Sequence, residues 1–446
     1  MGVETGTCHV DGKNCDSVQE ADAIEKLFQW AREGGAKFNK LDFDGRTAVA
    51  KEDMDGDEYL LYIPRNLFIC VDDDKLATHK YQQVSRLFEP GSRWLKVVLL
   101  TMRLLEEKFL GSKSFHKYHI ATIPKSFAFH PLMWSEQELT FTGLLPGLSK
   151  ALRDKDQLAQ IYEELQQAGI PQLFFGSNQQ FFTVEMFYWA YLAAATRNFN
   201  TLDVNAMIPL ADMLNHEMPE HNTQAVEVPC IKGRPEMCYS MSTTKPVKVG
   251  QELTISYGEG SNSELFWRYG FVLDNPGSDQ QEMYFDHKSE DSSIIHAAWA
   301  QLDEEKPDWK AGMLQTGANC SVVLQHLMRM ARLMVLHDKE AELMPSLVWW
   351  WDTYSPQPSV DNSSNAADSQ AKSDVDNRAI RFLFNSLAGY HRQLQELDGQ
   401  LQAGEFSDIL SPAKEQMVAT YSKNFVALVG TVQRCLRERY LSFLPY

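Results

Sequence analysis

The chain has 446 residues, of which 44% are hydrophobic and 11% aromatic, so it can bury a large core in two or three structural units. Its formal net charge of −18 repels nucleic-acid phosphates, so we expect no direct binding of DNA or RNA. The charge suits a basic protein substrate, although net acidity serves solubility equally well.

The seven cysteines are scattered and form no Cys-x-x-Cys pair, so they predict neither a zinc site nor a disulfide framework and favour a reducing compartment. The N-terminal region is acidic and lacks the apolar segment of a signal peptide, and no apolar run is long enough to cross a membrane. We expect a monomer in the cytoplasm, the nucleus or both, with a plastid still open, and no membrane contact.

Hydrophobic periodicity in the first half predicts helices around a small set of strands. Predicted helices cover 22–32, 92–110 and, with breaks, the region up to 183–197. Short strands are predicted at 47–50, 58–63 and 67–71, with a polar turn at 53–57. Strands return at 225–228, 237–241 and 252–256. A β-rich region is therefore split by a helical insert.

The sequence after residue 286 is almost wholly helical in pattern. Helices are predicted at 322–336, 378–401 and 412–443, and the segment 355–377, rich in Ser, Asp, Asn and Ala, is predicted to be a mobile loop. We therefore expect an α+β protein in three parts. They are an N-terminal helical segment over 1–40, a β-rich domain over 41–286 with its insert at about 85–200, and an all-α domain over 287–446.

Two short stretches combine an apolar segment with an abrupt polar end. Asn215 and His216 end the first, and Tyr257 followed by Gly258 ends the second. Such groups can fix a ligand or orient a reacting atom. Taken singly, a turn with a satisfied histidine and a core tyrosine are the better interpretations. Their order, with Ser-Asn-Ser-Glu and Tyr-Gly-Phe soon afterwards, is seldom supplied by chance.

These stretches resemble the SET-domain methyltransferases of the Rubisco large-subunit methyltransferase type, which include the actin-histidine methyltransferase branch. Further similarity is found at 44–54, 62–68 and 114–124, where Ser-Phe-His-Lys-Tyr-His-Ile-Ala-Thr-Ile-Pro is similar to a marker of the family's insert. The resemblance implies a SET domain split by a helical insert, a helical substrate-binding domain, S-adenosylmethionine as the cofactor and no metal.

The resemblance also implies a cofactor site. Its residues would be Arg197, Asp212, Asn215, His216 and Gly45. An arginine suits the cofactor carboxylate because its planar fork can bind both oxygens, although out of this context Arg197 is an ordinary cation at a helix end. The usual second glycine after Gly45 is Thr47 here.

Tyr257 is implied as the catalytic residue, with Phe199 and Tyr269 as walls of the substrate channel, although Phe199 could equally be a core residue. The histidine-methylating branch has a polar residue at the position of Phe199 and a tryptophan at that of Ala211. Because this chain differs from that branch at both positions, both residues favour lysine as the methylated side chain. We predict a protein-lysine N-methyltransferase. The alternatives are a protein-histidine N-methyltransferase with an actin-like substrate, an inactive SET-like binding protein, as Thr47 suggests, and an unrelated helical interaction protein.

Overall fold

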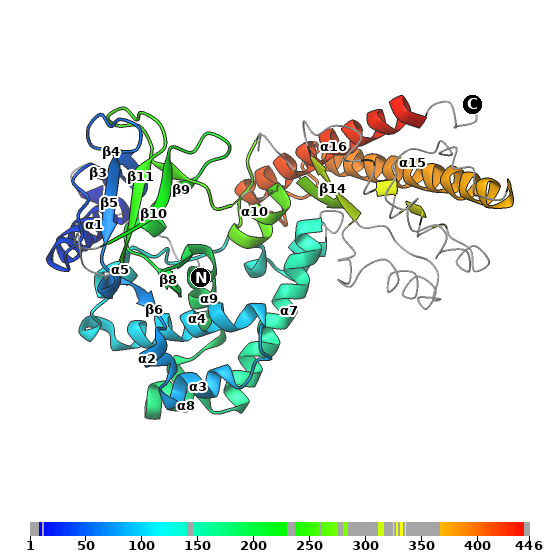
Figure 1. The fold of residues 1–446 in the computed structure, drawn as a ribbon. Coiled ribbons are helices and arrows are strands. Elements are labelled where there is room, and N and C mark those ends of the chain that lie inside the picture. Colours follow the sequence, from blue (N-terminus) through cyan, green and yellow to red (C-terminus); the bar gives the residue numbers. More distant parts are fainter. Residues whose placement is uncertain are drawn as a thin grey trace. The chain divides into compact units, whose positions relative to one another are not determined.

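The computed structural model describes residues 9–10, 13–140, 146–229, 237–258, 261–274, 280–283, 311–315 and 366–440, with a few positions between 324 and 335. The chain forms two compact units (Figure 1). Unit 1 comprises Met1–Phe127 and Lys155–Glu259, and unit 2 comprises Ala128–Asp154 and Gly260–Tyr446.

The division between the units differs from the boundary expected at residue 286. Residues 260–274 and 128–154 belong to unit 2. The reason is packing, because Trp134 meets Phe266 with ring centroids 5.5 Å apart and both side chains are fully buried in the core of that unit. Neither aromatic residue shows this partnership in its local sequence.

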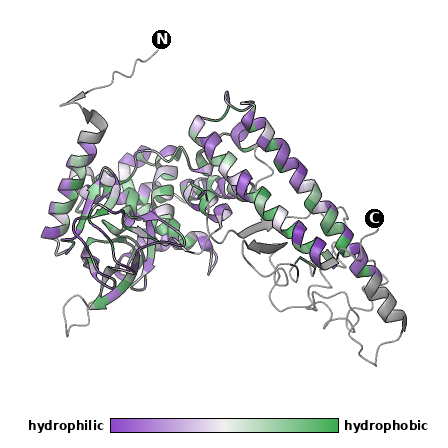
Figure 2. Ribbon diagram, turned by 90° about the horizontal axis from the view of Figure 1, so that it is seen from above, coloured by the Kyte–Doolittle hydropathy of each residue, from purple (hydrophilic) through white to green (hydrophobic). Residues whose placement is uncertain are grey.

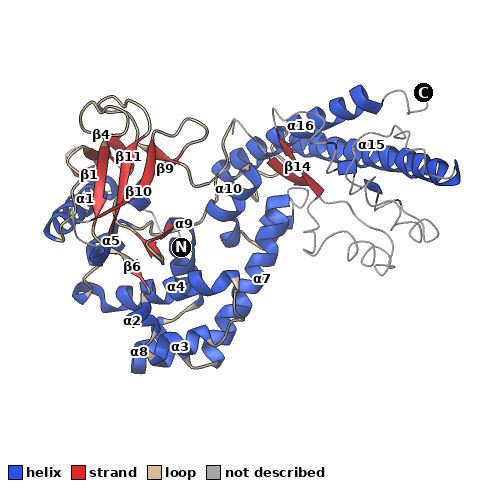
Figure 3. Ribbon diagram, viewed as in Figure 1, coloured by secondary structure: helices blue, strands red, loops and turns tan. Residues whose placement is uncertain are grey.

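Unit 1 holds most of the strands (Figure 3). They are β1 (His9–Val10), β2 (Lys13–Asn14), β3 (Leu41–Asp44), β4 (Thr47–Ala50), β5 (Tyr59–Ile63), β6 (Ile69–Cys70), β7 (Asn198–Thr201), β8 (Val204–Met207), β9 (Asn215–His216), β10 (Thr223–Pro229), β11 (Met237–Thr243) and β12 (Thr254–Ile255). Two antiparallel sheets run in the orders β10-β11-β5 and β6-β8-β7, while β1 pairs with β2 and β3 with β4. The pair β9 and β12 is parallel, and it joins segments about forty residues apart.

Unit 1 also contains helices. They are α1 (Cys15–Glu33), α2 (Asp73–Leu76), α3 (His79–Ser85), α4 (Arg93–Leu110), α5 (Lys117–Thr122), α8 (Ile170–Phe175) and α9 (Val184–Arg197), while α7 (Pro146–Gln167) is divided between the units. Ser92 and Thr183 cap the N-termini of α4 and α9 through their hydroxyl oxygens. The bounds of α4 and α9 agree with the helices predicted at 92–110 and 183–197 to within one residue.

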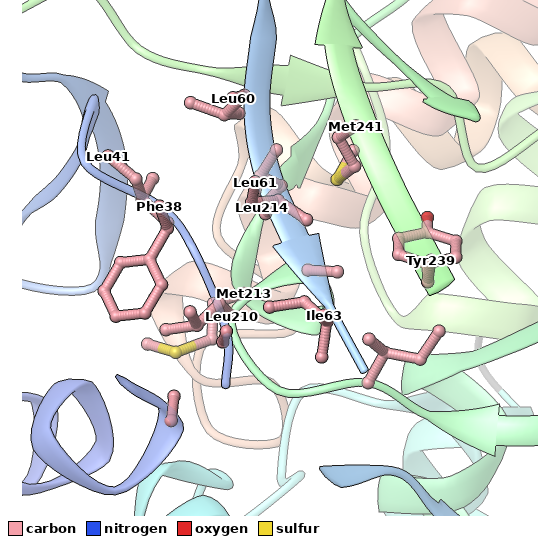
Figure 4. Close-up of a cluster of buried hydrophobic side chains, with 14 of the residues drawn as sticks. Phe38, Leu41, Leu60, Leu61, Ile63, Leu210, Met213, Leu214, Tyr239 and Met241 are labelled. Carbon is pink, nitrogen blue, oxygen red and sulfur yellow. The ribbon is translucent and has the colours of Figure 1, made fainter. Parts of the chain in front are cut away.

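The core of unit 1 lies between β5, β11 and the segment that follows β8 (Figure 4). Leu61 and Ile63 on β5 and Met241 on β11 are almost completely buried there. Leu210 and Leu214 join the same cluster from the segment after β8. This core therefore fixes the backbone on both sides of residues 211–213.

Unit 2 is mainly helical. Its described elements are α6 (Glu136–Thr140), α10 (Asn262–Tyr269), α15 (Ala366–Gln402), α16 (Pro412–Tyr440) and the antiparallel strands β13 (Gln280–Met283) and β14 (Ala311–Gln315). Figure 2 shows hydrophobic and hydrophilic residues interleaved along α15 and α16, as expected of helices that bury one face. Leu324, Leu327, Met328 and Ala331 are buried at helical spacing inside the expected helix 322–336.

One expectation for the second half is wrong. Residues 366–377 begin α15 instead of continuing a mobile loop, and within them Val375 is buried and Asp376 forms a buried ion pair of 2.7 Å with Arg332. Residues 355–365 lie outside the described part of the chain. The short strand β14, which pairs with β13, lies within the region expected to be almost wholly helical.

Cys238 and Cys435 each take part in a disulfide bond, whereas Cys70 is a buried free thiol. This contradicts the expectation of no disulfide framework, because sequence spacing does not show which cysteines meet in space. The argument for a reducing compartment therefore loses its support. Among the residues that the structure describes, no helix has the length and apolar character needed to span a membrane.

Candidate active site

A tight turn after β8 forms the centre of the candidate site. The chain passes through Leu210, whose φ of 68° is uncommon for a residue other than glycine, into a single 3-10 turn at Ala211–Met213. The backbone N–H of Asp212 donates to the carbonyl of Ile208 at 3.0 Å. The turn then leads directly into β9, which begins at Asn215.

Asp212 is held at both its side chain and its backbone. Its Oδ2 lies 2.8 Å from Nε2 of His119 on α5, and both side chains are almost completely buried. Its backbone oxygen accepts a hydrogen bond of 2.5 Å from Nη1 of Arg197, the last residue of α9. Arg197 and Asp212, both predicted as cofactor residues, are therefore in direct contact.

Arg46 is a second cation in this cluster, and the sequence analysis did not single it out. Its pKa is lowered, mainly by burial and next by the nearby positive charge of Arg197, while Asp212 acts in the opposite direction. Its Nη2 donates to the carbonyl of Thr122, at the end of α5, at 2.7 Å. The signal that could have found it is its place directly after Gly45.

Gly45 lies in the two-residue loop of the β3–β4 hairpin. Asp44 pairs with Thr47, which leaves Gly45 and Arg46 as the loop, and the φ of Gly45 is 59°. A positive φ at the first loop residue alone is the pattern of a type II′ turn, which favours glycine at that position. Thr47 is the first residue of β4, so the hairpin needs no glycine there.

The parallel pair β9–β12 brings the other predicted residues together. Asn215 is opposite Thr254 and His216 is opposite Ile255. The backbone N–H of Tyr257 donates to Nδ1 of His216 at 3.0 Å, so this nitrogen accepts and a neutral ring carries its proton on Nε2. The pKa of His216 is lowered, chiefly by burial, which favours the neutral ring.

The side chains of this strand pair have defined partners. The hydroxyl of Tyr257 donates to the backbone oxygen of Leu214 at 2.7 Å. Asn215 is exposed, and its Nδ2 donates to Glu252 at 2.8 Å. The turn at 211–214 thus offers one carbonyl to Arg197 and another to Tyr257.

Phe199 lies on β7 and packs against the same core as Tyr257. Its ring meets that of Tyr239 at 5.3 Å between centroids, with the planes 61° apart. The hydroxyl oxygen of Tyr239 is buried and has no hydrogen-bond partner among the described residues. Tyr239 is a site candidate that the sequence analysis missed, because a tyrosine inside a strand carries no distinguishing signal.

Tyr269 lies in unit 2, at the C-terminus of α10. It is half-buried, and its ring is 6.1 Å from that of Phe271 between centroids. The structure therefore brings Arg197, Asp212, Asn215, His216 and Tyr257 into one connected arrangement, with Gly45 beside it through Arg46. The place of Tyr269 in a substrate channel stays a prediction.

The site residues of unit 1 lie within a region that matches a known protein family. The model of the SET domain family matches residues 45–258, which begin at Gly45 and end directly after Tyr257. These residues form a SET domain. It lies almost wholly in unit 1, except for the inserted segment 128–154.

Curated relatives match more than half of the chain. N-lysine methyltransferase setd6 of Xenopus laevis is 25% identical over 288 residues, which cover 58% of this chain and 60% of the relative. The actin-histidine N-methyltransferase of Homo sapiens is 26% identical over 276 residues, which cover 58% of this chain and 44% of the relative. The chain therefore spans about half of the length of these relatives.

A solved structure matches nearly the whole fold. The crystal structure of the SET domain of LSMT bound to lysine and AdoHcy has a TM-score of 0.68 at 18% identity, and the match covers 95% of this chain and 92% of that one. The structure of Rubisco LSMT bound to AdoMet matches with a TM-score of 0.65 over 94% of this chain and 93% of that one, again at 18% identity. The expected α+β fold, with a SET domain and a helical C-terminal part, is confirmed.

Proposed function

We propose that the SET domain transfers a methyl group from S-adenosylmethionine to a lysine side chain of a protein. The observation that carries this proposal is the turn at 211–214, whose two carbonyls bind Arg197 and Tyr257. The turn joins a cluster of two arginines and a carboxylate to a tyrosine hydroxyl within a few residues of chain. Such a cluster suits a charged cofactor, and such a hydroxyl suits a reacting group.

The chemistry of the buried groups fits this cofactor. Nε of Arg197 and Oδ1 of Asp212 are buried, and neither has a hydrogen-bond partner in the described part of the structure. The methionine portion of S-adenosylmethionine carries a carboxylate and an ammonium group, which need a donor and an acceptor of this kind. Asn215, His216 and the hairpin at Gly45 complete the residues that would hold it. When bound, S-adenosylmethionine supplies a methyl group on a positively charged sulfur.

Tyr257 is suited to act as a hydrogen-bond acceptor at the reacting centre. Its proton is donated to the Leu214 carbonyl, so toward the reacting groups the phenolic oxygen can act only as an acceptor. That oxygen can accept weak C–H contacts from a polarised methyl group and a hydrogen bond from an amine. Because the carbonyl fixes the direction of the hydroxyl, little reorganisation is needed during the transfer.

The aromatic surroundings favour a neutral amine. Phe199 is half-buried against the core, and Tyr239 beside it is almost completely buried. Moving a lysine ammonium into such surroundings disfavours its charged form and lowers its pKa, and only the neutral amine can attack the methyl group. The lysine ammonium gives up one proton to solvent before the transfer.

Lysine is favoured over histidine because Phe199 presents an aromatic face and has no polar group to bind an imidazole nitrogen. The relatives include both kinds of enzyme, so histidine methylation is the second candidate. The net charge of −18 favours a basic protein as the substrate. We expect the protein to act as a monomer.

Incubation of the purified chain with labelled S-adenosylmethionine and a cell extract tests the proposal. Mass spectrometry of the labelled protein is expected to place the methyl group on lysine. A methylhistidine would support the second candidate instead. If calorimetry shows binding of S-adenosylmethionine but no cell extract yields a labelled protein, the chain is an inactive SET-like binding protein.

A further inference from the structure

The short helix α5 carries a buried histidine, His119, that contacts the turn at 211–214 although α5 lies far from that turn in the sequence. His119 is 0% exposed, and its Nε2 lies 2.8 Å from Oδ2 of Asp212, 93 residues further along the chain. An ionised carboxylate can only accept hydrogen bonds, so Nε2 is the donor. The carboxylate of Asp212 would be costly to bury without such a donor.

The C-terminal end of α5 is hydrogen-bonded both to the β3–β4 hairpin and to α9. The Thr122 carbonyl at its C-terminus accepts from Arg46 at 2.7 Å, and the carbonyl of Pro124, two residues further, accepts from Nε1 of Trp189 at 2.9 Å. Trp189 belongs to α9, the helix that ends at Arg197. His119 therefore projects from a segment that is fixed to both arginine-bearing elements.

We propose that His119 is a positioning residue for the cofactor site, which holds the turn at 211–214 in the geometry that serves both Arg197 and Tyr257. This inference rests on the proposed function. The turn presents two carbonyls, one to each of those residues, and the side chain of Asp212 anchors the turn to α5. Without the His119 donor, the buried carboxylate would move toward water or toward the arginines, and both carbonyls would move with it.

The test compares two replacements of His119 that differ in the hydrogen bond. His119→Leu keeps the bulk and removes the donor, whereas His119→Gln keeps a donor nitrogen at about the place of Nε2. We expect His119→Leu to raise the Kd of S-adenosylmethionine, measured by calorimetry, at least about tenfold, and His119→Gln to restore binding to within about threefold of the wild type. Amide hydrogen exchange of the cofactor-free protein is expected to become faster at residues 212–216 in His119→Leu only.

His116→Leu is the matched control. His116 is also buried and precedes the same helix, and its ring packs edge-on against Trp30 with centroids 6.0 Å apart. We expect this variant to lose stability without weakened cofactor binding or faster exchange at 212–216. If His119→Leu does not fold, His119→Asn takes its place, because its amide is too short to reach the position of Nε2.

Three results would overturn the inference. The first is wild-type affinity for S-adenosylmethionine in folded His119→Leu, or in His119→Asn where that variant replaces it. The second is binding by His119→Gln that is as weak as in this variant. The third is unchanged amide exchange at residues 212–216 in this variant. A wild-type chain that binds no S-adenosylmethionine would refute the proposed function instead. The exchange measurement on the cofactor-free proteins would then still decide the role of His119.

Discussion

Replacement of Tyr257 by phenylalanine separates a catalytic role of the hydroxyl from a structural one, because the two roles predict losses of very different size. A structural role affects the free energy of unfolding, and a catalytic role affects the rate of methyl transfer. The hydroxyl donates a hydrogen bond of 2.7 Å to the carbonyl of Leu214. Loss of one such bond costs about 1 kcal/mol of the free energy of unfolding, which corresponds to a fall in Tm of about 2–4 °C in a unit of this size. Even a protein with a stability of only about 5 kcal/mol would remain more than about 99% folded.

The proposed catalytic role predicts a much larger loss. Removal of one preorganised polar group at a reacting centre lowers the rate by about 10²–10³-fold, which unfolding of this size cannot produce. We expect Tyr257→Phe to bind S-adenosylmethionine nearly as the wild type does in calorimetry, and to transfer label to the substrate at least about a hundredfold more slowly. Tyr62→Phe is the control, since Tyr62 alternates with the core residues Leu61 and Ile63 along β5 and therefore lies on the other face of that strand. Transfer by Tyr257→Phe at the wild-type rate would remove this hydroxyl from the mechanism.

Three further outcomes follow from the structure. Asn215→Ala should raise the Kd of S-adenosylmethionine about 3- to 10-fold in calorimetry, and unchanged affinity would contradict its assignment as a cofactor residue. Gly270→Ala should destabilise unit 2 by at least about 1–2 kcal/mol in thermal melting, because Gly270 has a φ of 80° and a new Cβ would lie 2.8 Å from Cα of His130; a wild-type Tm would refute this. Burial lowers the pKa of His130 to about 4, so the folded state disfavours its protonation. Stability should therefore be full above about pH 6.5 and fall by up to about 1.4 kcal/mol per pH unit as the pH drops towards 4, and His130→Gln should flatten this slope in urea titrations.

Local patterns allowed the regular elements around the site to be predicted from the sequence. The capped helices that end at Leu110 and Arg197 have clear periodicity, and β4 and β5 are flanked by turn residues. The order of Asn215, His216 and Tyr257 indicated one site through its resemblance to a known family. The parallel pairing of β9 with β12 brings these residues together across about forty residues. These features depend on near neighbours or on a motif of fixed order.

The contacts that complete the site could not be predicted in the same way. His119 meets Asp212 across 93 residues, and Arg46 reaches Thr122 across 76. A buried histidine or a hairpin arginine has no local pattern that names its distant partner. The same limit explains the missed disulfide-bonded cysteines and the missed ion pair between Arg332 and Asp376 of α15.

The chain passes between the two units three times, after Phe127, after Asp154 and after Glu259, and this matters for anyone who wishes to shorten the protein. A fragment cut at the limits of the SET domain match would still carry residues 128–154. It would lack Phe266, against which Trp134 packs, and Lys414, which pairs with Glu138 at 2.5 Å. Such a fragment would expose a tryptophan and an unpaired carboxylate and would tend to aggregate. Expression of the isolated SET domain therefore requires a designed linker in place of residues 128–154, or else the whole chain.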